Sequence, residues 1–400
     1  MTESVVNQNS NVAPTSVWPV PTLSGPSTKA VEANRLAQAA LSGTQRQASA
    51  ALNPKATFFD FPKSSQIEID KFLGMGHQAW VATCWVTKAA TETKEVTRER
   101  YALKFFSAVY RTDKNYQQFL RSLSILQSED GSNPYITPYT AQLYSFTHRF
   151  GSDLLLMEYI SGPTFDQVIT QLRSVSVNQS VTGLSSEYKD MIRHFMMQIL
   201  SFLDVFHSQN IAYRDLKGEN IVIDENGWIR FVDFDMVKRM TEDSRPHTPC
   251  GSSLYGSPEV LGREPKPELL SDMWSFGVLL YFALYNAYPF SSNNFEQLRK
   301  EVCNNSLCFP GCATEEEKVL LSKLLVKNPE ERATSRDAMS HSFFAKFAGI
   351  NFNNPVILQQ PSPYKKQLEE VVRHLGDRGE EKDVSANMKR RIKKLLDRQA

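Results

Sequence analysis

The chain has 400 residues, of which 41% are hydrophobic and 22% charged, so it is long enough for two or three domains with buried cores. Its formal net charge of +1 excludes a global electrostatic field that would attract nucleic acid or a strongly acidic partner. No apolar run reaches the roughly 18 residues of a membrane span, and the five cysteines include no Cys-x-x-Cys pair, which argues against a disulfide framework or a zinc site.

Residues 1–64 are predicted to form a disordered tail. They are rich in Ala, Ser, Thr, Gln, Asn and Pro and contain few aromatic residues, so they bury too little apolar surface to fold alone. The opening MTESVVNQNS lacks the basic region of a signal peptide, and Thr2 stands where N-myristoylation requires glycine. We therefore expect a cytoplasmic protein, with the nucleus as the alternative location.

Residues 67–158 are rich in strand-forming segments. The run IEIDKFLGMGHQAWVATCWVT predicts two strands around a glycine turn, and YALKFF predicts a third. Two more strands, LYSFTHRFG and SDLLLMEYI, flank Gly151, whereas the charged residues 88–100 are expected to form a solvated hairpin loop. Residues 114–127 show the apolar spacing of a helix.

From about residue 164 the pattern becomes helical. Residues 171–184 predict a Ser- and Val-rich loop, and Ser185 or Ser186 is the expected N-cap of a long helix. Apolar residues recur at helical spacing along that helix, and further helices are predicted through residues 271–345.

Residues 347–400 are predicted to form a C-terminal tail with two helices. The first is QLEEVVRHLG, and the second, NMKRRIKKLLDRQA, places basic side chains opposite apolar ones. This basic amphipathic helix suits nuclear import, contact with an anionic lipid surface, or a partner protein. The alternative is a helix folded back on the preceding domain with its basic face in solvent.

The stretch YRDLKGENIVIDENGWIRFVDFD, at residues 213–235, concentrates the chemistry. It carries two carboxylates, a lysine and an amide, which are Asp215, Lys217, Asn220 and Asp233. Phosphoryl transfer uses these groups: a carboxylate orients and deprotonates the attacking hydroxyl, a cation meets the γ-phosphate, and amide and carboxylate oxygens hold magnesium. The turn Glu225-Asn226-Gly227 predicts a hairpin that brings both metal ligands to one point.

This stretch resembles the catalytic and metal-binding loops of eukaryotic protein kinases, and the resemblance covers about residues 67–346. It implies an α+β, two-lobed kinase domain at residues 65–346. A small antiparallel sheet with one main helix would form the lobe at residues 65–158, and a larger helical lobe would span residues 159–346. ATP and Mg²⁺ would bind between the lobes, and the γ-phosphate would pass to a protein Ser or Thr hydroxyl.

The resemblance also implies roles for individual residues. Asp215 would be the catalytic base, while Lys217 and Lys104 would stabilise the transferring phosphoryl group, and Asn220 and Asp233 would bind magnesium. The residues implied to bind the nucleotide are Gly74, Gly76, Val81, Ala102, Lys104, Met157, Glu158, Ile160, Glu219 and Val222.

Within that set, the two glycines would let the backbone approach the phosphates. Val81 and Ala102 would cover the adenine ring, with Val222 below it. The backbone of Glu158 and Ile160 would bind adenine, and Met157 would lie behind the ring.

Three positions depart from the family pattern. Ala79 replaces the third glycine of the phosphate loop, and Asp235 replaces the glycine of Asp-Phe-Gly. Ser122 stands where the family has the glutamate that pairs with the lysine. One hypothesis is that Asp235 partly replaces this glutamate, by pairing with Lys104 or by aiding magnesium; the alternative is a tolerated surface aspartate. The departures also leave a rival function, a pseudokinase or weakly active scaffold that binds ATP and protein partners.

Residues 236–259 resemble an activation segment. Thr248 stands at its phosphorylation position, and Arg214 and Lys238 are the cations implied to bind the phosphate. An upstream kinase acting on Thr248 is therefore an implied partner. Residues with implied structural roles are the buried helix Asp272, the pair of Glu259 and Arg332, and a packed column of Tyr213, Phe234 and Leu126.

The subgroup and the substrates are less sharply indicated. The form Tyr213-Arg214-Asp215 is closest to the cyclic-nucleotide-dependent kinases, whereas residues 328–344 look more like calmodulin-dependent kinases. Lys217 is the form found in Ser/Thr kinases. Thr164 replaces one acidic residue that arginine-requiring kinases carry, so no strong arginine requirement is expected. The implied partner is a protein substrate. We expect no transmembrane segment and no specific nucleic-acid site in this chain.

Overall fold

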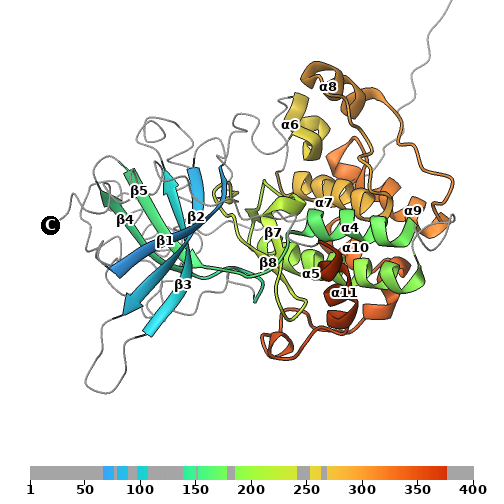
Figure 1. The fold of residues 1–400 in the computed structure, drawn as a ribbon. Coiled ribbons are helices and arrows are strands. Elements are labelled where there is room, and N and C mark those ends of the chain that lie inside the picture. The colour runs from blue at the N-terminus through green and yellow to red at the C-terminus, as the bar shows by residue number, and fades with distance from the viewer. Residues whose placement is uncertain are drawn as a thin grey trace, which may run out of the picture.

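A small antiparallel sheet lies beside a larger, mostly helical body (Figure 1). This arrangement comes from a computed structural model, which describes residues 66–75, 79–88, 97–106, 122, 138–149, 152–177, 185–240, 253–262 and 268–375. The predicted N-terminal tail and the helix expected over residues 114–127 lie outside the described residues, apart from Ser122. The described part therefore has the two lobes that the resemblance implies.

The sheet contains the five strands expected from the sequence. They are β1 (Ile67–Met75), β2 (Ala79–Lys88), β3 (Thr97–Phe106), β4 (Leu143–Arg149) and β5 (Ser152–Glu158). Their spatial order is β1-β2-β3-β5-β4, and every neighbouring pair is antiparallel. Because side chains alternate between the faces of a sheet, Leu103 packs in the cluster on one face while Ala102 packs in the cluster on the other.

The charged stretch predicted as a loop is partly strand. Residues 97–100 extend β3 and pair with β2. The reason is that their charges find partners on β1: Arg98 forms an ion pair with Glu68, and the Arg100 guanidinium lies 2.8 Å from Asp70 Oδ2. These ion pairs reach across β2, which lies between β1 and β3, so they add to the pairing of residues 97–100 with β2.

The helical lobe is built around two long helices that are buried along most of their length, α5 (Ser186–His207) and α7 (Glu268–Tyr285). Ser185 is the N-cap of α5, and its hydroxyl accepts a hydrogen bond from Tyr188 N at 3.3 Å, as predicted. The other helices are α4 (Phe165–Val177), α6 (Pro258–Gly262), α8 (Phe295–Asn304), α9 (Glu315–Leu324), α10 (Ser335–Met339) and α11 (Lys365–Leu375).

The predicted loop at residues 171–184 begins too early, because α4 continues to Val177. Leu172 is buried and extends the apolar face that Val168 and Ile169 begin. This face packs into the core of the large lobe, and α4 also lies against α11. Tertiary packing thus keeps a Ser- and Val-rich segment helical.

The segment that follows residue 346 continues the packing of the large lobe. Phe352, Tyr364, Leu368 and Val371 join the same buried cluster as α5 and α7. Residues 367–375 of the predicted helix QLEEVVRHLG lie within α11, beside α4 (Figure 1). The second predicted helix, which carries the basic face, lies outside the described residues.

Two further features bear on the sequence predictions. The guanidinium of Arg332 binds both carboxylate oxygens of Glu259, at 2.8 and 3.0 Å, which confirms that pair.

Among the described residues, no helix combines the length and the apolar character that crossing a membrane requires.

We predict that Phe352→Ala lowers the free energy of unfolding by about 3–5 kcal/mol, because it removes a ring that is 1% exposed from the shared core. Denaturant unfolding of the full chain measures this change. Val356→Ala is the matched control, since Val356 lies four residues further on and is 57% exposed. Equal small effects from both variants would show that the C-terminal segment is not part of the core.

Candidate active site

The loop that carries Asp215 is fixed from below by a buried carboxylate. This loop joins β6 (Ile211–Ala212) to β7 (Ile221–Ile223). Asp272 on α7 accepts hydrogen bonds from Tyr213 N at 2.8 Å and Arg214 N at 2.7 Å. Arg214 has a φ of 71°, a left-handed conformation that is uncommon for a residue with a side chain. Asp272 thus has the structural role that the resemblance implied.

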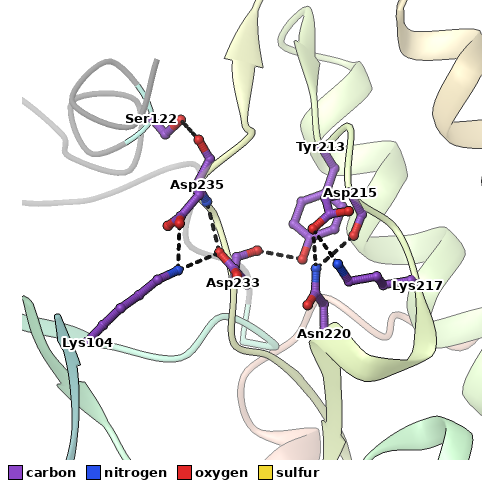
Figure 2. A network of polar contacts seen from close by, with 8 residues as sticks. All are labelled: Lys104, Ser122, Tyr213, Asp215, Lys217, Asn220, Asp233 and Asp235. Carbon is purple, nitrogen blue, oxygen red and sulfur yellow. Dashed lines mark hydrogen bonds and ion pairs between the residues drawn. The ribbon is translucent and has the colours of Figure 1, made fainter. Parts of the chain in front are cut away.

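Asp215 presents one occupied oxygen and one free oxygen. Its Oδ2 lies 3.0 Å from Lys217 Nζ and accepts a hydrogen bond of 2.8 Å from Asn220 Nδ2 (Figure 2). The same amide group donates to the Asp215 backbone carbonyl at 2.9 Å. Oδ1 is buried and accepts no hydrogen bond from the described residues. A buried acceptor without a donor is costly, so this oxygen is available to accept a further hydrogen bond.

The predicted hairpin brings Asn220 and Asp233 to the same end of a strand pair. β7 pairs with β8 (Ile229–Phe231), and Gly227 in the turn has the positive φ of 80° that favours glycine. Val232 N donates to Asn220 O at 3.1 Å, which closes the open end of the hairpin. The two predicted metal ligands therefore flank one backbone hydrogen bond.

Lys104 reaches this end of the hairpin from β3. Its Nζ lies 3.0 Å from Asp233 Oδ1 and 2.6 Å from Asp235 Oδ2 (Figure 2). Burial opposes the charge on Lys104, but the attraction of the two carboxylates outweighs it and raises the pKa of the lysine. Burial and the Asp233 charge raise the pKa of Asp235, whereas Lys104 lowers that of Asp233 despite its burial. The lysine therefore stays charged.

An aromatic column supports the metal-ligand loop. Tyr213 donates its hydroxyl to Asp233 O at 2.6 Å, and its ring meets Phe234 edge-on at 5.9 Å. Leu126, the third predicted member of this column, lies outside the described residues.

The residues predicted to surround adenine come together on the inner face of the sheet. Ala102 and Met157 are opposite each other on β3 and β5, and Val81 and Ile160 pack against the same small cluster. Val222 is half-buried on β7 in the large lobe. The apolar side chains on this face would suit contact with a flat aromatic base.

The structure describes only some of the other residues predicted to bind the nucleotide. Gly74 lies on β1 opposite Val81, and Gly76 falls outside the described residues. Glu158 N donates to Gln142 O at 2.7 Å, while its carboxylate lies 2.6 Å from Arg230 Nη2. Glu219 lies in the loop between β6 and β7 and is exposed.

A residue that the sequence analysis missed holds both cations predicted to bind phosphate. The carboxylate of Glu268 lies 2.6 Å from Arg214 Nε and 2.9 Å from Lys238 Nζ, where Lys238 belongs to β9 (Lys238–Arg239). Thr248 lies outside the described residues. Glu268 stands four residues before Asp272, one turn away on the same helix face, and this spacing was the available signal.

Comparison with known proteins identifies the family. The description "Protein kinase domain" matches residues 67–344. The chain belongs to the protein kinase family. This kinase is 28% identical to CBL-interacting protein kinase 5 of Oryza sativa subsp. japonica, over 55% of its own length and 52% of that protein.

Two other relatives agree with this assignment. CBL-interacting serine/threonine-protein kinase 5 of Arabidopsis thaliana is 32% identical over 45% of this chain and 40% of that protein. Protein kinase kin1 of Schizosaccharomyces pombe is 33% identical over 46% of this chain and 20% of that protein. The matches thus span about half or less of these relatives. Membership of the protein kinase family is confirmed, while the predicted closeness to cyclic-nucleotide-dependent kinases is not.

The side chains present fit a magnesium ion only together with a nucleotide. Within the described residues, no group of three or more His, Cys, Asp or Glu side chains could hold a metal ion. Asn220 and Asp233 supply two oxygen donors at one end of the hairpin, and magnesium commonly completes its coordination with phosphate and water oxygens.

Proposed function

We propose that this kinase transfers the γ-phosphate of ATP to Ser or Thr hydroxyls of proteins. The observation that carries the proposal is the state of Asp215. One of its oxygens is fixed by Lys217 and Asn220, and the other is buried without a hydrogen-bond donor. That geometry suits a base that receives a proton from a hydroxyl held beside it.

The surrounding residues supply position and charge. Lys217 lies where it meets both Asp215 and the incoming phosphoryl group, and Lys104 binds the phosphates from the sheet. Asn220 and Asp233 would hold magnesium, which would neutralise charge on the phosphates. Val81, Ala102 and Met157 would exclude water from the adenine ring.

The rival function is a kinase-fold scaffold without turnover. It rests on Ser122, Asp235 and Ala79. The first two departures leave Lys104 with a half-buried carboxylate partner, and Ala79 is a small buried residue at the start of β2. An active enzyme is therefore the better supported proposal.

The subgroup and partners extend the same proposal. The relatives named CBL-interacting kinases and kin1 favour a place near those kinases rather than near the cyclic-nucleotide-dependent ones. Protein substrates follow from the transfer to Ser or Thr. The basic helix predicted near the C-terminus would bind a partner or an anionic surface.

We predict that Asp215→Asn lowers kcat by about 10²–10⁴-fold, because an amide does not accept the hydroxyl proton. Transfer of labelled γ-phosphate to a generic basic protein measures the rate. Glu369→Gln is the control, since it removes an exposed carboxylate on α11 and should leave the rate unchanged. Equal rates for the wild type and Asp215→Asn would refute the enzyme and favour the scaffold.

Phosphorylation of Thr248 stays part of the proposal. A phosphate there would meet Arg214 and Lys238, which already share Glu268. Because Glu268 already holds these two cations, we predict that Thr248→Ala lowers kcat/KM only in part. Adding Glu268→Gln to Thr248→Ala should lower kcat/KM further in the same assay. If Thr248→Ala keeps full activity in both the wild-type and Glu268→Gln backgrounds, Thr248 has no regulatory role.

A further inference from the structure

The partner of Lys104 is on a different element from the one the family uses. In the kinases that this chain resembles, a glutamate on the helix of the small lobe pairs with the lysine, and Ser122 stands at that position. We propose that Asp235 positions Lys104 in place of that glutamate, and that Ser122 holds the backbone of Asp235. This inference rests on the proposed kinase function.

Of the two carboxylates beside Lys104, Asp235 makes the closer contact. Its Oδ2 is 2.6 Å from Nζ, compared with 3.0 Å for Asp233. The Asp235 side chain is 15% exposed, whereas that of Asp233 is 33% exposed. Asp233 is thus the more exposed of the two carboxylates, as a metal ligand must be, and Asp235 is the closer and more buried partner of the lysine.

The backbone around Asp235 is held from two sides. Asp235 N donates to Asp233 Oδ1 at 3.1 Å, so the two aspartates are linked through the loop itself. The buried Ser122 hydroxyl lies 3.0 Å from Asp235 O and 2.8 Å from Val237 O, as hydrogen-bond donor to these carbonyls (Figure 2 shows the first). Asp235 is not among the described residues with positive φ, so its side chain replaces glycine without left-handed strain.

The two departures from the family pattern therefore compensate each other. A hydroxyl at position 122 can donate to the two carbonyls, whereas a glutamate carboxylate would face them as an acceptor. It would also add a third negative charge beside Asp233 and Asp235. Conversely, glycine at position 235 would leave Lys104 with Asp233 alone. Serine at one position and aspartate at the other form a matched pair.

This arrangement ties the lysine to the metal-ligand loop. In the family's usual arrangement, the pairing depends on where the helix docks. Here the carboxylate and the metal ligand are two residues apart on one short loop, and Ser122 contributes a hydroxyl to the backbone of that loop. The position of Lys104 is then set mainly by the loop at residues 233–237.

The test removes the carboxylate from position 235 and places one at position 122. Asp235→Asn and Asp235→Gly should each lower kcat/KM for ATP by about tenfold to hundredfold, the value of one charge-assisted hydrogen bond. Asp235→Glu should retain more activity than Asp235→Asn. The double variant Asp235→Gly/Ser122→Glu, which restores the family pattern, should recover activity relative to Asp235→Gly, whereas Ser122→Glu alone should lower it.

Two measurements separate a positioning role from a structural one. Thermal unfolding reports the fold of each variant, and the affinity for ATP reports the position of Lys104 even where turnover is absent. Unchanged or higher kcat/KM and ATP affinity in Asp235→Gly would overturn the inference, because Asp235 would then be neutral or inhibitory. A folded double variant no better than Asp235→Gly would also overturn it.

The outcome for the proposed function is read separately. If the wild type shows no transfer that depends on Asp215, the proposed function fails. The ATP affinities of the same five variants then still decide whether Asp235 positions Lys104.

Discussion

The Asp272 carboxylate at the centre of the large lobe is the constraint on which the site depends. It accepts two backbone N–H groups from Tyr213 and Arg214, and His207 Nε2 lies 3.0 Å from one of its oxygens. These bonds hold Arg214 in a conformation that it would not adopt freely. The carboxylate of Asp215, one residue on, is consequently directed toward Lys217 and Asn220.

The charged groups around this loop are paired with one another. The buried or half-buried carboxylates of Asp215, Asp233 and Asp235 lie close to Lys104 and Lys217, so each negative group has a cation within reach. Buried charges are tolerable only when they are paired in this way. Glu268 follows the same rule, because its carboxylate pairs with both Arg214 and Lys238.

Features set by local sequence were predictable. Alternating apolar residues gave the five strands, the turn at Gly227 gave the hairpin, and Ser185 was a recognisable N-cap. The carboxylates, lysine and amide between Asp215 and Asp233 indicated phosphoryl transfer from the sequence alone. Even the pairing of Asp235 with Lys104 could be framed as a hypothesis, because two departures from one pattern invited a common explanation.

What escaped prediction depends on partners far along the chain. Residues 97–100 became strand because β1 offers opposite charges, and α4 runs to Val177 because the lobe's core and α11 cover its apolar face. The spacing to Asp272 places Glu268 on the same helix face, but it does not reveal that Arg214 and Lys238 converge on Glu268. No window of local sequence contains these relations, since they are created by packing.

The segment after residue 346 also touches the catalytic hairpin from outside. Ser362 N donates to Asn226 O at 2.8 Å in its turn, and Trp228 Nε1 donates to Gln360 O at 2.8 Å. During synthesis the N-terminal part of a chain emerges first. The hairpin that carries Asn220 and Asp233 therefore lacks these outer supports until the chain has been translated past residue 362. Ribosome-bound chains that end earlier would expose the turn and Trp228, so this hairpin gains its outer contacts only after residue 362 has been translated.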